Sequence, residues 1–152
     1  FHRTYGINAV VSRCSNNYGP RQDVEKLIPH FISKLSQKQK VPLYGDGGNI
    51  RDWLHVDDHC DAIWTIFTRA VPGSIYNIWG NNELTNKQIT YLLLDAFEYG
   101  DDMIEYVIDR LWHDKRYAID SSKLQRELGW IPHIPFAQGI QDTIKRYTDT
   151  LV

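Results

Sequence analysis

Short apolar runs alternate along the chain with longer segments in which apolar residues recur every three to four positions. The first run, Ile7–Ser12, is rich in β-branched residues and predicts a strand buried in a parallel sheet. Similar runs predict strands at 41–44, 50–54, 74–79 and 104–108, and helical spacing predicts helices over 25–38, 57–70, 85–97, 122–128 and 136–151. Strands and helices therefore alternate, which indicates an α/β class with an incomplete sheet.

Residues with special backbone preferences predict where these elements begin and end. The opening FHRTYG is typical of a last helical turn closed by Gly6. Capping boxes are expected at 85–88 and 122–125, where Ser or Thr is followed three residues later by Gln. The segment 13–20 is expected to be a polar loop, and Gly45–Gly48 a tight turn joining its two flanking strands.

Composition excludes several classes of protein. The 152 residues carry 17 Lys and Arg against 19 Asp and Glu, and 42% are apolar, as in a globular domain. This balance gives no basic surface for nucleic acid, and no run is long enough for a membrane helix. Two cysteines, Cys14 and Cys60, are too few for a disulfide framework, which predicts a reducing, cytoplasmic location. The chain lacks an initiating Met, so we expect it to begin inside a longer protein.

Motifs of a self-sufficient catalyst are missing from the sequence. It contains no Gly-x-Ser-x-Gly elbow, no phosphate-binding loop, no three-glycine dinucleotide fingerprint and no Tyr-x-x-x-Lys pair. His55 and His59 have zinc-like spacing, but Val56 stands where a zinc helix has glutamate, so we predict no metal. More informative are polar and cationic residues at predicted strand ends and loops, including Arg51, which could clamp a diphosphate; ordinary surface polarity is the alternative.

Several longer motifs occur in order along the chain: SNNYGP at 15–20, EKLIP at 25–29, VPLYGDG at 41–47, RDWLHVDDH at 51–59, YNIWGNNE at 76–83, DRLWHDKRYAID at 109–120 and KLQRELGW at 123–130. Together they resemble the C-terminal part of nucleotide-sugar 4,6-dehydratases of the extended short-chain dehydrogenase family. The resemblance implies an NAD cofactor and a dTDP-sugar substrate, oxidised at C4, dehydrated across C5 and C6, and reduced at C6. It implies a cytoplasmic enzyme that forms a homodimer when complete.

The resemblance also implies how the chain is divided. Residues 1–24 would be the last elements of a Rossmann-type NAD-binding domain, and residues 25–152 a smaller α/β substrate-binding domain. The nucleotide loop and the catalytic groups would lie upstream of Phe1, so we predict no catalytic residue in this chain. With its sheet incomplete, the isolated chain would expose apolar surface and behave poorly in solution.

The family's motifs assign binding roles to individual positions. Asn17 would approach the nicotinamide side of NAD. The substrate-binding positions would be Asn16, Lys26, Leu27, Pro42, Leu43, Tyr44, Arg51, Asn86, Asp109, Arg110 and His113. Among these, Pro42–Tyr44 would form the nucleobase wall and Arg51 would face the diphosphate.

Two positions depart from the family pattern. Leu111-Trp112 stands where the family has Pro-Gly, and Trp79 replaces the first glycine of a usual Tyr-Asn-Ile-Gly-Gly. Either change could alter nucleotide preference. The alternatives are therefore a dehydratase acting on UDP-glucose or GDP-mannose, and a non-catalytic module that binds nucleotide sugars.

Overall fold

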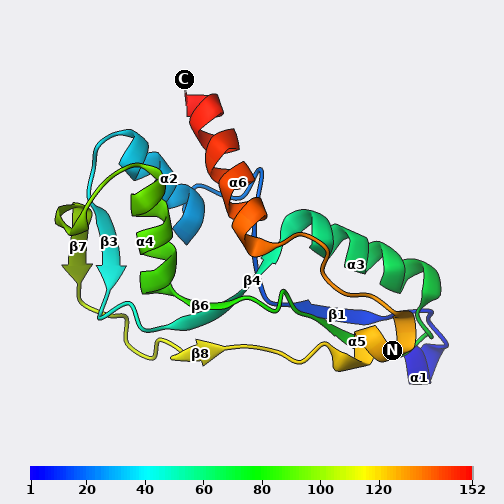
Figure 1. Ribbon diagram of the computed structural model, residues 1–152. Coiled ribbons are helices and arrows are strands. Elements are labelled where there is room, and N and C mark those ends of the chain that lie inside the picture. Colours follow the sequence, from blue (N-terminus) through cyan, green and yellow to red (C-terminus); the bar gives the residue numbers. More distant parts are fainter. Residues whose placement is uncertain (152) are drawn as a thin grey trace.

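The computed structural model describes the backbone of residues 1–151 and the side chains of residues 1–149, and it shows an elongated α/β molecule (Figure 1). The helices are α1 (His2–Tyr5), α2 (Leu27–Ser36), α3 (Val56–Arg69), α4 (Asn86–Ala96), α5 (Ser122–Leu128) and α6 (Phe136–Leu151), with a short 3₁₀ turn, η1 (Asp101–Met103). The strands are β1 (Val11–Cys14), β2 (Asn16–Tyr18), β3 (Val41–Tyr44), β4 (Ile50–His55), β5 (Ile75–Ile78), β6 (Glu83–Thr85), β7 (Ile104–Val107) and β8 (Arg116–Tyr117). The predicted α/β class is confirmed.

The strands form three small sheets. β1 pairs with β5, and β3 pairs with β7, both in parallel. β4 is the central strand of the third sheet, because it pairs with β2 and β8 in parallel and with β6 in antiparallel orientation. Within the described residues, strands adjacent in sequence therefore seldom pair, and most pairings join distant segments.

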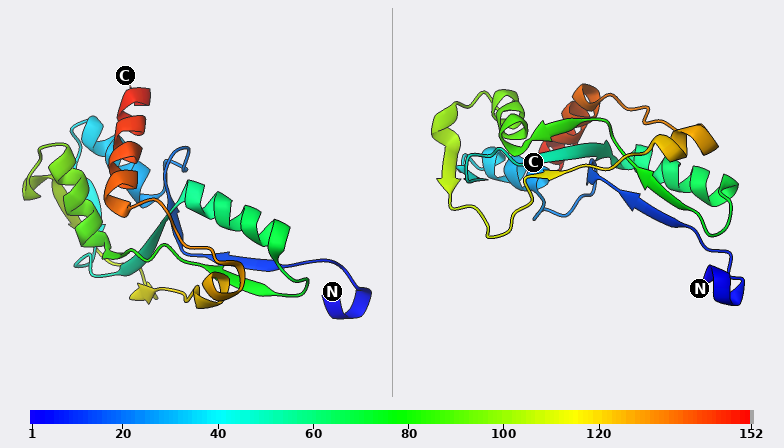
Figure 2. Two further views of the ribbon diagram at one scale, coloured as in Figure 1. Left: turned by 45° about the vertical axis from the view of Figure 1, so that its right-hand side comes forward. Right: turned by 90° about the horizontal axis from the view of Figure 1, so that it is seen from below.

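Two hydrophobic cores lie on either side of β4. Trp53 belongs to the core that α2, α4, α6, β3 and β7 surround, whereas the next residue, Leu54, belongs to the core of α3, α5 and β5. Because successive side chains of a strand point to opposite faces, one strand supplies both cores. Figure 1 shows the resulting lobes to the left and right of β4, and Figure 2 shows α1 projecting from the right-hand one.

A buried carboxylate connects β4 to the loop after β5. The Asp52 side chain is fully buried, and its two oxygens accept the backbone N–H groups of Gly80 at 2.7 Å and Asn82 at 2.6 Å. These charge-assisted bonds satisfy an otherwise costly buried charge. Gly80 packs so closely on the backbone of Trp53 that a β-carbon there would collide with the Trp53 carbonyl group. The loop therefore requires glycine at this position.

Most predicted helix ends are confirmed. Gly6 and Gly129 adopt left-handed backbone conformations after α1 and α5. Thr85 and Gln88 form the reciprocal capping box of α4. The box expected at 122–125 is wrong, because Ser121 is the cap residue and the Ser122 hydroxyl instead donates to Asp120. The helix predicted over 136–151 forms as α6, and the side chain of Leu151 at its end lies outside the described residues.

Three strand predictions need correction. The first strand covers Val11–Cys14 instead of 7–12, because only this part is in register with β5. The expected loop 13–20 contains β2. Its asparagines have a low strand propensity, but the segment is extended because it pairs with β4. Gly45–Gly48 is a turn as expected, but its flanking strands do not pair with each other: β3 pairs with β7, and β4 pairs with β2, β6 and β8.

Candidate functional site: a pocket lined by Tyr44 and Arg110

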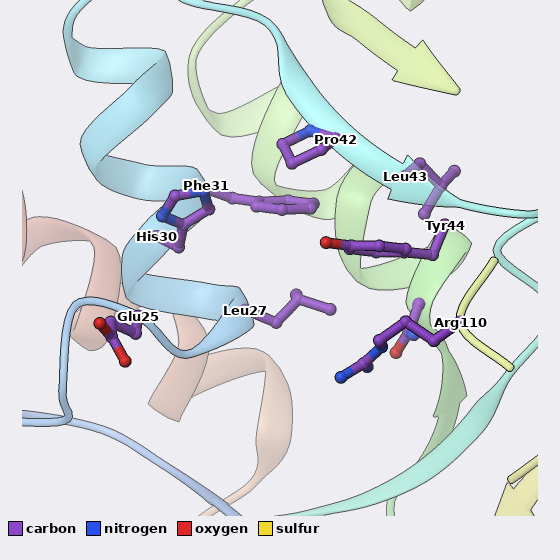
Figure 3. Close-up of a pocket in the computed structure, with 9 residues that line it drawn as sticks. Glu25, Leu27, His30, Phe31, Pro42, Leu43, Tyr44 and Arg110 are labelled. Atoms are coloured by element: carbon purple, nitrogen blue, oxygen red, sulfur yellow. The ribbon is translucent and has the colours of Figure 1, made fainter. Parts of the chain in front are cut away.

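A pocket of about 230 Å³ opens between α2, β3 and the start of α4 (Figure 3). Five of its nine lining residues are apolar or aromatic, and the other four are polar or charged. The lining residues are Glu25, Leu27, His30, Phe31, Pro42, Leu43, Tyr44, Asn86 and Arg110. A concave site that combines apolar walls with a few polar groups is typical of a small-molecule binding site.

Arg110 is held in place by two neighbours. Its guanidinium carbon lies 5.2 Å from the centroid of the Tyr44 ring, a cation–π contact. Its Nη2 atom lies 3.2 Å from Nε2 of His113, whose Nδ1 is in turn 2.7 Å from a carboxylate oxygen of Asp109. A neutral imidazole with its proton on Nδ1 satisfies both bonds, because it donates to Asp109 and accepts from Arg110.

One cation of the pocket, Arg110, has no ion-pair partner among the described side chains. The hydrogen bond from His113, aided by the Arg110 backbone N–H, lowers the pKa of the Asp109 carboxyl below its usual value. Asp109 is therefore ionised at neutral pH and orients the imidazole. Arg110 forms no ion pair among the residues whose side chains are described, whereas Arg116 is bound by both carboxylate oxygens of Glu83. The charge of Arg110 is thus available to a phosphate group.

The structure brings together about half of the predicted substrate-binding residues. Six line the pocket: Leu27, Pro42, Leu43, Tyr44, Asn86 and Arg110. Asp109 and His113 lie beside it and position Arg110. Lys26 is the exposed cap residue of α2, next to the pocket but outside its lining.

Arg51 lies apart from this lining, on β4. Its guanidinium group donates to the backbone carbonyl groups of Ile50 at 2.7 Å and Asp114 at 2.9 Å. The bond to Asp114 connects β4 to the segment after β7. A phosphate on Arg51 would have to use its remaining N–H groups.

Asn16 and Asn17 lie in β2, just beyond the carboxyl end of β1. The Asn17 amide donates to Cys14 Sγ and to the Ser15 carbonyl oxygen. Its own oxygen, Oδ1, and the Ser15 hydroxyl are buried without a hydrogen-bond partner in the part of the chain that the structure describes. These atoms lie at the carboxyl end of a parallel strand, where open α/β sheets bind ligands.

Three pocket residues were not identified from the sequence: Glu25, His30 and Phe31. His30 and Phe31 follow Leu27 by three and four positions in α2, so they share its helix face. This spacing was a usable signal, because Leu27 had been predicted to contact substrate. Phe31 serves two roles, because its ring is buried in the core and also borders the pocket.

One histidine of the pair considered for metal, His55, caps a helix. His55 caps α3, because its Nδ1 atom accepts the Asp57 backbone N–H at 3.2 Å. Within the described residues, no three His, Cys, Asp or Glu side chains gather as metal ligands would. Nor is any described helix long and apolar enough to span a bilayer.

Comparison with known proteins places the chain in a family. The sequence model of the family described as GDP-mannose 4,6 dehydratase matches residues 1–143. The chain belongs to this family. The resemblance inferred from the motifs is thereby confirmed, and the two departures, Trp79 and Leu111-Trp112, lie within the matched region.

Relatives within the GDP-mannose 4,6 dehydratase family include dTDP-glucose 4,6-dehydratases. Those of Streptomyces antibioticus and Streptomyces griseus are 52% and 51% identical to this chain, over 98% and 96% of its length. In each case the match covers only 44% of the relative. The chain thus spans less than half the length of these curated relatives.

Solved structures of nucleotide-sugar enzymes also match nearly the whole chain and less than half of their own length. The dTDP-glucose 4,6-dehydratase of Streptomyces venezuelae, crystallised with NAD, has a TM-score of 0.95 and 45% identity over 97% of this chain and 46% of its own. A UDP-glucose 4-epimerase of Thermotoga maritima, crystallised with UDP-glucose, has a TM-score of 0.92 at 28% identity, over 99% of this chain and 49% of its own. The fold is therefore common to enzymes that act on different nucleotide sugars.

Proposed function

We propose that this chain is the substrate-binding part of an NAD-dependent dTDP-glucose 4,6-dehydratase. The complete enzyme would convert dTDP-glucose to dTDP-4-keto-6-deoxyglucose. The observation that carries the proposal is the pocket in which the Tyr44 ring and the Leu27 side chain offer apolar surface to a base, while Arg110 in the same lining has no carboxylate partner among the described side chains. Relatives near 50% identity with that activity favour dTDP-glucose over UDP-glucose or GDP-mannose.

The residues present fit their assigned roles toward the substrate. A nucleobase stacked on Tyr44 would place its phosphates toward Arg110, which His113 and Asp109 hold in position. Asn86, at the start of α4, borders the same pocket and offers an amide to the nucleotide. Lys26 and Arg51, which lie outside the pocket lining, would contribute positive charge toward the diphosphate. These side chains bind and orient the substrate.

The carboxyl end of β1 fits the nicotinamide end of NAD. Asn17 Oδ1 and the Ser15 hydroxyl are buried polar atoms with no partner among the described residues, and a carboxamide group supplies both a donor and an acceptor. When bound, NAD would accept the C4 hydride of the sugar and return it at C6. Asn17 would orient the nicotinamide, and Asn16 would contact the sugar or its diphosphate.

The division of the chain is part of this proposal. Residues 1–24 would belong to the NAD-binding domain and residues 25–152 to the substrate-binding domain, with the catalytic groups supplied by the part of the relatives that this chain does not match. A homodimer for the complete enzyme and a cytoplasmic location complete the proposal. Both cysteines are free thiols, as expected in a reducing compartment.

Calorimetric titration of the 152-residue chain with dTDP-glucose, UDP-glucose and GDP-mannose tests the proposal. We expect dTDP-glucose to bind most tightly and Arg110→Ala to weaken it about tenfold or more, since a charge-assisted hydrogen bond contributes about 1.5–3 kcal/mol. Arg3→Ala is the matched control, because it removes the same charge from the exposed surface of α1. Equal affinity for the three sugars, or equal effects of the two substitutions, would refute the proposal.

A further inference from the structure

The pocket carries hydrogen-bonding groups at two opposite ends. Figure 3 shows Arg110 at one end and Glu25 and His30 at the other, with Leu27 and Tyr44 between them. The two ends also differ in charge, because Arg110 is a cation whereas Glu25 is an acidic residue. A phosphate group would bind at the cationic end, which leaves the end with Glu25 and His30 for a different part of the ligand.

Neither Glu25 nor His30 uses its polar atoms within the described part of the chain. The Glu25 carboxylate forms no hydrogen bond or ion pair with a described residue, and the His30 imidazole packs against the Phe31 ring, with centroids 6.2 Å apart. An ionised carboxylate can only accept hydrogen bonds, whereas an imidazole has an N–H donor in either protonation state. This end of the pocket therefore offers a ligand one acceptor group beside one donor group.

The backbone that carries these two residues is held in place by contacts inside the lobe. Glu25 precedes α2, and its N–H donates to a side-chain oxygen of Asp23 at 2.9 Å. The same segment is connected to α6, because the Tyr147 hydroxyl donates to the Gln22 carbonyl oxygen at 2.7 Å. His30 lies within α2 itself. The backbone at this end of the pocket is thus ordered before a ligand binds, which lowers the entropic cost of binding.

An acceptor beside a donor complements a ligand edge on which an N–H group lies next to a carbonyl group. Thymine and uracil have such an edge, because their N3–H lies between two carbonyl groups, and guanine has a similar one at N1. Cytosine differs at both positions, since its N3 is an acceptor and an amino group replaces the carbonyl group at C4. Proteins that bind a free base commonly combine hydrogen bonds to this edge with stacking on an aromatic side chain.

We propose that Glu25 and His30 determine which nucleobase this chain accepts. The Glu25 carboxylate accepts the N3–H of the pyrimidine, and the His30 imidazole donates to a carbonyl oxygen beside it. The inference rests on the proposed function, in which the base stacks on Tyr44 and the phosphates bind Arg110. Because Glu25 and His30 lie at the end opposite Arg110, they face the edge of the base that points away from the phosphates. Cytidine and adenosine nucleotides lack the matching edge and are excluded.

UDP and CDP are the sharpest pair of probes, because they share the ribose and the diphosphate and differ only at N3 and C4 of the base. Calorimetric titration of the 152-residue chain should show at least about tenfold tighter binding of UDP than of CDP. In Glu25→Ala the two affinities should lie within about threefold of each other, because the acceptor for N3–H is gone. Glu105→Ala is the matched control, since Glu105 is exposed on β7 outside the pocket lining, and it should keep the wild-type ratio.

The direction of each effect separates hydrogen bonding from charge and from folding. Loss of the Glu25 charge by itself would strengthen binding of an anionic nucleotide, so weaker UDP binding by Glu25→Ala reports the lost hydrogen bond. His30→Leu should weaken dTDP binding about three- to tenfold, whereas His30→Gln keeps an N–H donor and should weaken it less. Thermal unfolding of each variant verifies that it folds as the wild type does.

The outcomes are distinguishable from those for the proposed function. Equal affinity of the chain for UDP and CDP, a wild-type ratio retained in Glu25→Ala, or unchanged dTDP binding by His30→Leu would overturn this reading of the base. A preference for dTDP-glucose that depends on Arg110 would stand in each of these cases. Equal affinity for dTDP-glucose, UDP-glucose and GDP-mannose would instead refute the proposed function, while tighter binding of UDP than of CDP would still support the roles of Glu25 and His30.

Discussion

Tyr44→Ala tests whether the aromatic wall of the pocket holds a nucleobase. Tyr44 is 39% exposed at the end of β3, so its ring contributes little to the core and is available to a ligand. Stacking of a base on an aromatic side chain contributes about 1–3 kcal/mol. Loss of the ring should therefore weaken dTDP binding by about 5- to 140-fold. Tyr44→Phe keeps the stacking surface and should remain within about threefold of wild type.

The matched control for this prediction is Tyr106→Ala. Tyr106 is 58% exposed on β7, the strand paired with β3, and it faces Leu43 in the register. Both alanine variants lose the same strand propensity, so any shared cost of folding cancels. Calorimetric titration with dTDP measures the affinities, and thermal unfolding verifies that both variants fold. Equal dTDP affinities for Tyr44→Ala and Tyr106→Ala would refute the assignment of this wall to a base.

Three further predictions concern stability. Gly80→Ala should lower the free energy of unfolding, measured with denaturant, by about 1–3 kcal/mol, because its β-carbon would collide with the Trp53 backbone. The control Gly100→Ala should leave this free energy nearly unchanged, because its β-carbon would meet only the flexible end of the Asp102 side chain. Asp58→Ala should cost about 2–3 kcal/mol in the same assay, since the buried carboxylate accepts two backbone N–H groups just before α6. Partial burial lowers the pKa of His59 below 6.5, so protonation opposes folding: stability present above pH 6.5 should fall as the pH drops below it. Thermal melts at pH 7.5 and 5.5 should show a smaller decrease for His59→Gln than for wild type, and an equal decrease would contradict this role.

Local signals in the sequence were sufficient to locate most elements but not to pair them. The Thr85–Gln88 box and the left-handed Gly129 involve residues within four positions of each other, and both formed as predicted. The Ser122 box failed because Ser122 already lies in the first turn of α5 and Ser121 is the cap residue, while the Ser122 hydroxyl donates to Asp120 and accepts from Arg126. The strand β2 was missed because its Asn-Asn-Tyr sequence has no strand periodicity, and only its pairing with β4 makes it extended.

For the candidate site too, the sequence predicted some features and missed others. Motif order placed Leu27, Tyr44 and Arg110 in one binding function, and the fold does bring them into one pocket. Motifs gave no indication that His113 holds Arg110, or that His30 faces the same pocket. Arg51, predicted to face the diphosphate, donates to the backbone carbonyl groups of Ile50 and Asp114, and its role toward the substrate stays a prediction.

The sequence by itself determined the α/β class, the main helices and the family, because each follows from short-range periodicity or from the order of motifs along the chain. Only the tertiary structure decided which strands pair, how β4 divides its side chains between two cores, and which apolar residues stay exposed on α3. These features depend on contacts between distant residues, such as Asp58 with the backbone of His133, 75 positions away. Such contacts form only when distant parts of the chain come together, so no local sequence pattern predicts them.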